Sequence, residues 1–133
     1  MNKLYNWGRQ GFLEGLVSWL TDDIRVVLVN TQVYTVNLAT HRTLADIPEA
    51  AVMGSSDGLT GKTSTDGVAD ADDVAFASTT AGFIGAAVIY KYNATRSNAR
   101  LIGYIDTAIN LPTTGGGPYR LVWDSTANRI FKL

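Results

Sequence analysis

The sequence predicts an all-β protein: a single-domain sandwich or barrel, with a jelly-roll-like sandwich as the first choice. Three observations support this prediction. Two apolar runs, Ala86–Tyr92 and Leu101–Asp106, flank a polar link, as two antiparallel strands do. Residues Ile24–Thr31 form the most β-branched run in the chain. Turn-forming residues recur throughout, and no convincing long helical pattern is present.

Size and composition bound the possible functions. The chain has 133 residues, the size of one ordinary domain, so we expect a single β domain over 1–133. It is 46% hydrophobic and only 17% charged, below the roughly 25% of an average soluble protein. Such a chain folds compactly or covers part of its surface with partners. The net charge of −1 gives no general attraction to nucleic acid or to acidic membranes, and no segment is long enough to span a membrane.

The runs Ala86–Tyr92 and Leu101–Asp106 are expected to form the middle of the fold. Neither run alternates cleanly between apolar and polar residues, which is typical of strands covered on both faces. The first run places Val88, Tyr90 and Tyr92 on one face, with Ala87, Ile89 and Lys91 on the other. The second places Leu101, Gly103 and Ile105 opposite Ile102, Tyr104 and Asp106.

The N-terminal segment 1–20 is rich in large apolar residues but is interrupted by Gly8, Gly11 and Gly15. Each glycine costs a helix roughly 1 kcal/mol relative to alanine, so we expect an extended arm that enters a strand near Phe12. Two alternatives are open: the segment completes the core as a first strand, or part of it packs on another subunit. The candidate subunit contacts are its aromatic residues, Trp7, Phe12 and Trp19.

The remaining elements are short. Leu44–Pro48 is expected to be a helical turn stopped by proline, or a loop, and Glu49–Met53 a brief strand. Residues 54–73 predict a loop with one short strand around Leu59–Thr65, followed by a strand at Val74–Ala77 and a turn at Thr79–Gly82. Leu111–Pro118 predicts a loop. Beyond it, Tyr119–Asp124 and Arg129–Leu133 are expected to pair as a last hairpin around Ser125–Asn128.

No residue pattern indicates catalysis. There is no cysteine, which excludes disulfides and thiolate chemistry, and His41 is the only histidine. It lies in a polar stretch without an accompanying nucleophile motif, so a surface or hydrogen-bonding role is expected. Glu14 and Glu49 are the only glutamates, and nothing links them as a glycosidase pair. Gly115–Gly117 precedes a proline and a strand, so it lacks the context of a phosphate-binding loop. No cofactor is expected.

An acidic cluster, Asp66, Asp70, Asp72 and Asp73, lies within eight residues. Calcium takes six to eight oxygen ligands, so such a cluster is a conceivable ion site. Its spacing does not match the calcium-binding loop of an EF-hand, and solvated carboxylates in a turn-rich loop are the preferred interpretation. We therefore expect no required metal. A β-rich domain without catalytic or metal signatures is more often a structural or binding module than an enzyme.

Several stretches of the sequence are similar to one group of known proteins: Asn6–Phe12 followed by Glu14-Gly15, Leu44–Pro48, Asp66–Phe76, Trp123-Asp124 and Asn128–Leu133. Together they resemble small virion structural proteins of tailed bacteriophages. The resemblance implies a head decoration, or cement, protein that binds the major capsid protein on the capsid exterior and is made in the host cytoplasm. It also implies a homodimer or homotrimer. The alternative is a tail-associated or receptor-binding module. No residue-level role is carried over from the family.

Overall fold

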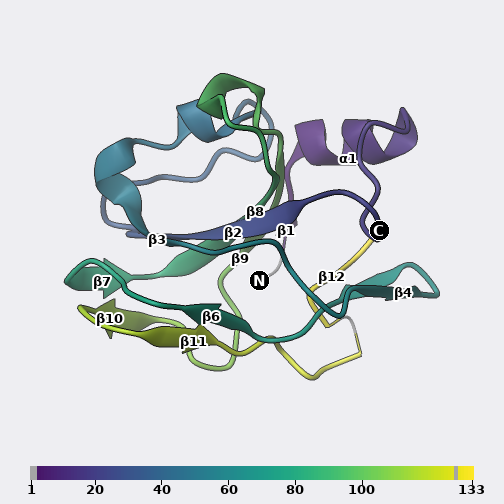
Figure 1. Cartoon of the computed structure of the whole chain (residues 1–133). Coiled ribbons are helices and arrows are strands. Elements are labelled where there is room, and N and C mark those ends of the chain that lie inside the picture. Colours follow the sequence, from purple (N-terminus) through teal and green to yellow (C-terminus); the bar gives the residue numbers. More distant parts are fainter. Residues whose placement is uncertain (1–2, 128) are drawn as a thin grey trace.

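The computed structural model describes residues 3–127 and 129–133. Met1 and Asn2 of the predicted N-terminal segment, and Asn128 of the last predicted turn, lie outside the described residues. The fold is mostly β and sandwich-like, as the sequence predicts. A five-stranded sheet lies between a layer of short helices and a layer of small sheets (Figure 1). Among the described residues, no helix is sufficiently long and apolar to cross a membrane.

The five-stranded sheet is antiparallel and has the order β1-β9-β8-β2-β3. Its strands are β1 (Lys3–Leu4), β2 (Ile24–Val29), β3 (Val52–Ser55), β8 (Ala86–Lys91) and β9 (Leu101–Ile105). The predicted central pair is therefore confirmed, with β8 in the middle of the sheet. Every residue of β8 and β9 except Lys91 is buried, which confirms that this pair is covered on both faces.

A bulge in β9 corrects the predicted faces of that strand. Tyr90 pairs with Leu101, whereas Ile89 pairs with Gly103, so Ile102 is an additional residue in β9. An extra residue shifts the alternation of side chains by one position. As a result Leu101 and Tyr104 belong to the core on the helical side of the sheet, whereas Ile102 and Ile105 belong to the core on its other side.

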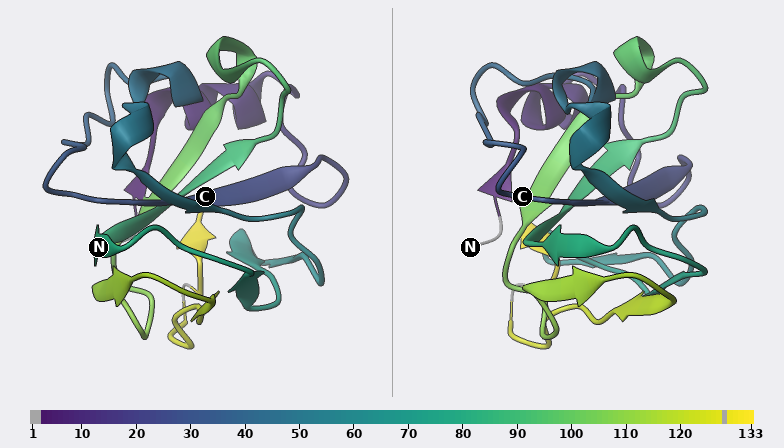
Figure 2. Two further views of the ribbon diagram at one scale, coloured as in Figure 1. Left: turned by 60° about the vertical axis from the view of Figure 1, so that its left-hand side comes forward. Right: turned by 90° about the vertical axis from the view of Figure 1, so that its left-hand side faces the viewer.

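Three small antiparallel sheets form the layer opposite the helices (Figures 1 and 2). Their strands are β4 (Thr63–Thr65), β5 (Val68–Asp70), β6 (Val74–Phe76), β7 (Gly82–Ile84), β10 (Thr113–Gly115), β11 (Tyr119–Leu121) and β12 (Phe131–Lys132). The pairs are β10 with β7, β11 with β6, and β12 with β5 and β4. Apolar side chains of this layer, including Phe76, Ile84 and Leu121, pack on the five-stranded sheet.

The observed strands and their pairing correct three predictions. The strands at Tyr119–Leu121 and Phe131–Lys132 exist, but each pairs with a strand from the middle of the sequence and not with the other. The stretch Leu111–Pro118 contains β10, and residues 54–73 contain β5 as well as β4. The strand order supports a sandwich-like fold but does not establish a jelly-roll topology, which stays a prediction.

The helical layer consists of α1 (Asn6–Leu13) and three 3₁₀ turns, η1 (Leu44–Asp46), η2 (Glu49–Ala51) and η3 (Arg96–Asn98). The turn at η1, followed by Pro48, confirms the first of the two alternatives for that stretch. Together with the buried residues Tyr5 and Tyr34, this layer covers the second face of the five-stranded sheet. Both faces of the central strands are thus protected from water.

Candidate interaction surface

The N-terminal segment contains a helix and not the extended arm that the glycines predict. Gly8 explains the difference, because a Cβ at this position would lie 2.8 Å from the Cα and O of Ile102 in β9. Gly11 is similar, since its Cβ would lie 2.8 Å from Val17 and 2.9 Å from the Arg100 side chain. The two glycines let α1 lie directly on the sheet edge. Packing thus offsets the weak helix propensity of glycine.

Two of the three predicted subunit contacts are used within the chain. Trp19 is buried and meets Phe131 edge-on, with ring centroids 5.3 Å apart. Phe12 is half-buried and packs on the same ring at 6.0 Å. Aromatic pairs at these separations contribute beyond simple area burial. The first alternative, that this segment completes the core, therefore describes Trp19 and the inner side of Phe12.

Leucines around these rings remain in contact with water. Leu13 is 88% exposed, Leu16 48%, Leu20 53% and the C-terminal Leu133 60%. Leu133 directly follows β12, the strand that carries Phe131 (Phe131–Lys132). The C-terminus lies beneath α1 in each view (Figures 1 and 2). We call Leu13, Leu16, Leu20 and Leu133 the leucine surface. Apolar residues grouped in this way are typical of interaction sites.

The segment that carries three of these leucines is held in place by hydrogen bonds. The Lys91 ammonium donates to the Leu16 carbonyl at 2.7 Å and lies 3.3 Å from the Asp22 carboxylate. Asp22 in turn accepts the Ser18 backbone N–H at 2.7 Å. Gly15, with φ of +72°, ends the helix in a left-handed conformation and is open to solvent. The loop that carries Leu16 and Leu20 is therefore held in place between α1 and β2.

Trp7, the third predicted contact, has a different environment. The guanidinium carbons of Arg42 and Arg100 lie 4.5 Å and 4.3 Å from the centroid of its ring. Arg100 also donates from Nη1 to the Trp7 carbonyl at 2.7 Å. Partial burial lowers the pKa of the Arg100 guanidinium. We call Trp7, Arg42 and Arg100 the tryptophan–arginine cluster. A single chain does not test contacts between subunits, so the intersubunit role of Trp7, Phe12 and Trp19 stays a prediction.

His41 lies in a hydrogen-bonded chain on the helical side of the sheet. Its Nδ1 accepts the Asn37 backbone N–H at 3.2 Å, so this nitrogen carries no proton. The Tyr34 hydroxyl, 2.8 Å away, donates to the same nitrogen and accepts from the Tyr5 hydroxyl at 2.9 Å. Burial raises the pKa of Tyr34 to about 12 and that of Tyr5 further. The chain fastens the loop around Asn37 to the sheet, in line with the hydrogen-bonding role expected for His41.

Asp46 closes the turn η1. Its carboxylate accepts the backbone N–H of Arg42 at 2.7 Å and that of Thr43 at 3.2 Å, in a capping box with Thr43. The hydrogen bond from Arg42 is the largest of the effects that hold the pKa of Asp46 below its ordinary value. A carboxyl group with a depressed folded-state pKa stabilises the protein above its unfolded-state pKa of about 3.9.

We expect Asp46→Asn to lower the free energy of unfolding at pH 7 by about 1 kcal/mol, the usual worth of a helix cap. The difference from the wild type should disappear as the pH falls through the folded-state pKa, because the wild-type carboxyl is then neutral as well. Urea unfolding between about pH 7 and pH 2 measures it. Asp57→Asn is the control, because the Asp57 carboxylate makes no hydrogen bond among the described residues. A difference that persists unchanged at the acid end would contradict this account.

The acidic cluster mainly fastens the chain to itself. The Asp73 carboxylate accepts the Trp123 backbone N–H at 3.1 Å, and the Asp72 carboxylate accepts the Thr60 hydroxyl at 3.0 Å. Asp66 forms the turn between β4 and β5 together with Gly67, at φ of +52° and +79°. Within the described residues, no group of three or more carboxylate or histidine side chains is arranged to hold a metal ion. Asp66, Asp72 and Asp73 are exposed, in line with the solvated-loop hypothesis, and the last two also accept hydrogen bonds from the chain.

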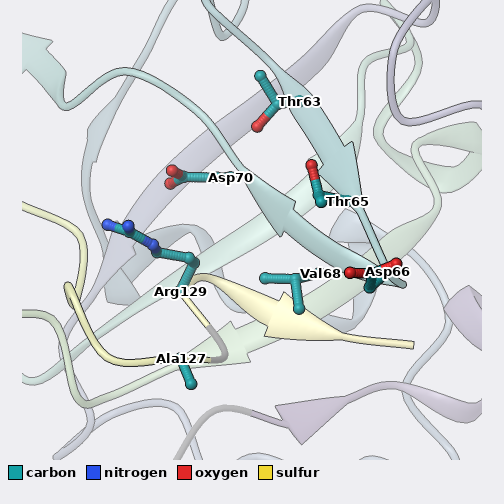
Figure 3. Close-up of a pocket in the computed structure, with 7 residues that line it drawn as sticks. All are labelled: Thr63, Thr65, Asp66, Val68, Asp70, Ala127 and Arg129. Atoms are coloured by element: carbon teal, nitrogen blue, oxygen red, sulfur yellow. The ribbon is translucent and has the colours of Figure 1, made fainter.

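A polar hollow of about 350 Å³ lies over β4 and β5 (Figure 3). Thr63 and Thr65 share one face of β4, and Asp70 lies opposite Thr63 on β5. Arg129 reaches over the same face from a left-handed backbone conformation, with φ of +47°. Hydroxyl, carboxylate and guanidinium groups that converge in this way can hydrogen-bond a polar ligand. Among the described residues, no aromatic side chain lines the hollow to stack on a sugar ring.

Two features of these surfaces were not predicted from the sequence. The leucines at positions 13, 16 and 20 are spaced as on one helix face, but the helix ends at Leu13, so the spacing does not show which of them are exposed. The guanidiniums beside Trp7 come from positions 42 and 100, and no local signal links those positions to residue 7.

Comparison with known proteins does not assign the chain to a family, because no protein-family model and no curated protein matches it.

Proposed function

We propose that this chain is a structural protein of a tailed-bacteriophage virion, which binds the major capsid protein on the outside of the shell and stabilises it. The resemblance of the stretches from Asn6 to Leu133 to small virion proteins suggests the class. The observation that carries the proposal is the leucine surface, because it presents apolar side chains from a fixed loop. A decoration protein needs such an adhesive surface and a stiff framework, and it requires no catalytic pocket or cofactor.

The physical basis is burial of apolar surface across subunits. Removing apolar area from water contributes about 25 cal/mol per Å². Stable interfaces bury about 1,200–2,000 Å² in total, more than the leucine surface alone supplies, so the surrounding polar loops contribute as well. Repetition on a symmetric shell multiplies modest contacts into high avidity. We propose that the chain also associates with itself, as a homodimer or homotrimer, through the same N-terminal region.

We expect a Leu13→Ser, Leu20→Ser double variant to fold normally but to lose self-association and capsid decoration. Both side chains are largely exposed, so their replacement removes little folded-state packing. Sedimentation velocity of the purified protein and binding to heads that lack it measure the two effects. Ile109→Ser is a matched control, since Ile109 is 62% exposed but lies outside the leucine surface. A double variant that assembles and decorates like the wild type would contradict the proposal.

The polar hollow favours a second candidate function, that of a tail-associated or receptor-binding module. Thr63, Asp70 and Arg129 present groups that can hydrogen-bond the hydroxyls of a host glycan. Electron micrographs of virions labelled with antibody distinguish the two locations. Label on heads, together with loss of DNA from undecorated heads at lower temperature than from complete ones, is expected. Label on tails alone would replace the decoration proposal by this second one.

A further inference from the structure

The chain contains two arginine–aromatic arrangements that differ in one respect. Arg25 lies 3.7 Å from the centroid of the Tyr92 ring, and the Asp23 carboxylate accepts hydrogen bonds from its Nε at 3.1 Å and its Nη2 at 3.0 Å. That guanidinium therefore has both an aromatic ring and a carboxylate. A guanidinium can use both interactions at once, since it stacks on a ring with its face and binds a carboxylate bidentately with its edge.

The tryptophan–arginine cluster lacks the carboxylate. Arg42 and Arg100 both lie within 4.5 Å of the Trp7 ring centroid, yet within the described part of the chain neither makes an ion pair with a carboxylate. Two carboxylates act on these guanidiniums from beyond ion-pair distance, since Glu14 favours the charged form of Arg100 and Arg42 favours the charged form of Asp46. The Asp46 carboxylate accepts backbone N–H groups of Arg42 and Thr43, and the Glu14 carboxylate accepts the Gln10 amide at 3.3 Å.

The cluster is held together by three chain segments. Trp7 belongs to α1, whose close approach brings the Gly11 turn against the Arg100 stem. The segments of the two arginines pair with each other, because Thr43 and Arg100 form a β-bridge and the Leu101 N–H donates to the Arg42 carbonyl at 2.9 Å. Two positive charges are therefore kept beside one ring by the fold itself. Neither guanidinium has a carboxylate at ion-pair distance within the described residues, and a bound anion supplies one.

We propose that the tryptophan–arginine cluster binds an acidic segment of a partner protein, whose carboxylates take the place that Asp23 takes beside Arg25. Both guanidinium carbons lie within 4.5 Å of the centroid of one half-buried ring, so at most about 9 Å separates them, a distance that about three extended residues span. A protein segment fits better than nucleic acid for two reasons. The chain has a net charge of −1, which gives no general attraction to a long polyphosphate, and a guanidinium pairs bidentately with a single carboxylate, as Arg25 does with Asp23. The inference uses residues outside the leucine surface and does not depend on the capsid proposal.

A peptide-binding experiment tests the assignment. The probe is a hexaglutamate peptide, titrated by calorimetry into the full chain at low and at physiological ionic strength, with a hexalysine peptide and a short single-stranded DNA as comparisons. We expect hexaglutamate to bind, hexalysine not to bind, and the affinity to fall as salt is added. Arg42→Gln should weaken binding about tenfold or more, because it removes a charge-assisted hydrogen bond.

The matched control is Arg25→Gln, which removes a guanidinium that already has its carboxylate and should leave peptide binding unchanged. Arg42 is exposed, so its variant is expected to fold, and circular dichroism checks this. The Leu13→Ser, Leu20→Ser variant should bind hexaglutamate normally, which separates this inference from the proposed function. Failure of hexaglutamate to bind, equal loss in both arginine variants, or tighter binding of DNA than of peptide would each overturn the proposal.

Discussion

Replacement of Trp19 by alanine is expected to destabilise the protein by about 3–5 kcal/mol, the range for a large buried aromatic residue. Trp19 is 6% exposed and meets the Phe131 ring at an interplanar angle of 85°. Its indole N–H donates to the carbonyls of Thr63 at 3.1 Å and Asp70 at 3.3 Å. The variant therefore loses packing and a polar tie to the β4–β5 hairpin together. Urea unfolding followed by far-ultraviolet circular dichroism measures the loss.

Two further variants locate the origin of this effect. Trp19→Phe keeps most of the apolar surface but removes the N–H donor, and it should cost about 1–3 kcal/mol. Leu13→Ala, at an exposed position on the same segment, should stay within about 0.5 kcal/mol of the wild type. If Trp19→Ala instead kept full stability and lost only self-association, Trp19 would be the subunit contact that the sequence suggests.

The long strands were predictable because their signal is local. Ile24–Val29 and Ala86–Lys91 are apolar and β-rich over six residues each, and burial on both faces removes the need for polar alternation. The pairing of β8 with β9 followed from the polar link between them. The faces of β9 were predicted wrongly, because the additional residue Ile102 shifts the alternation; the adjacent Gly103 is a signal for a bulge, but strict alternation was assumed through it.

The short strands were harder because their pairing depends on distant parts of the chain. β5, β7 and β10 have three residues each and lie in stretches rich in turn-forming residues. Their partners are fixed when the small sheets pack on the central sheet, and the partner of β5 is the C-terminal strand β12 as well as β4. Sequence proximity favoured a final hairpin of β11 with β12, but in the folded chain β11 pairs with β6 and β12 pairs with β5.

The candidate site was predictable only in outline. A segment rich in tryptophan and leucine indicates apolar contact, but it does not show which of its side chains face the core. Leu13 faces outward because Gly8 sets α1 against β9, whereas Trp19, beyond the end of α1, faces inward because it packs on Phe131 and donates to the carbonyls of the β4–β5 hairpin. The partners of Trp7 lie at sequence separations that no periodic pattern detects. Which side chains of this segment are buried and which are exposed therefore depends on packing against distant parts of the chain.

Gly8→Ala is the second large effect that we expect, a loss of about 3 kcal/mol, at the upper end of the usual cost of overpacking. In an isolated helix the substitution is favourable by roughly 1 kcal/mol, so intrinsic propensity predicts the opposite sign. In the folded chain the new Cβ would lie 2.8 Å from the Cα and O of Ile102 and 2.9 Å from the O of Leu101. These are backbone atoms of β9, a strand of the five-stranded sheet, and they cannot rotate away as a flexible side chain can.

Urea unfolding of Gly8→Ala beside Gly117→Ala tests this account. Gly117 has no heavy atom within 4 Å of the position of a Cβ, and its φ lies outside the left-handed region, so alanine there should be nearly neutral. Because α1 carries Trp7 and Leu13, helix displacement in Gly8→Ala should also weaken hexaglutamate binding and self-association under conditions where the protein remains folded. Equal stability of Gly8→Ala and the wild type would mean that α1 does not rest on β9, and both surfaces would then have to be located anew.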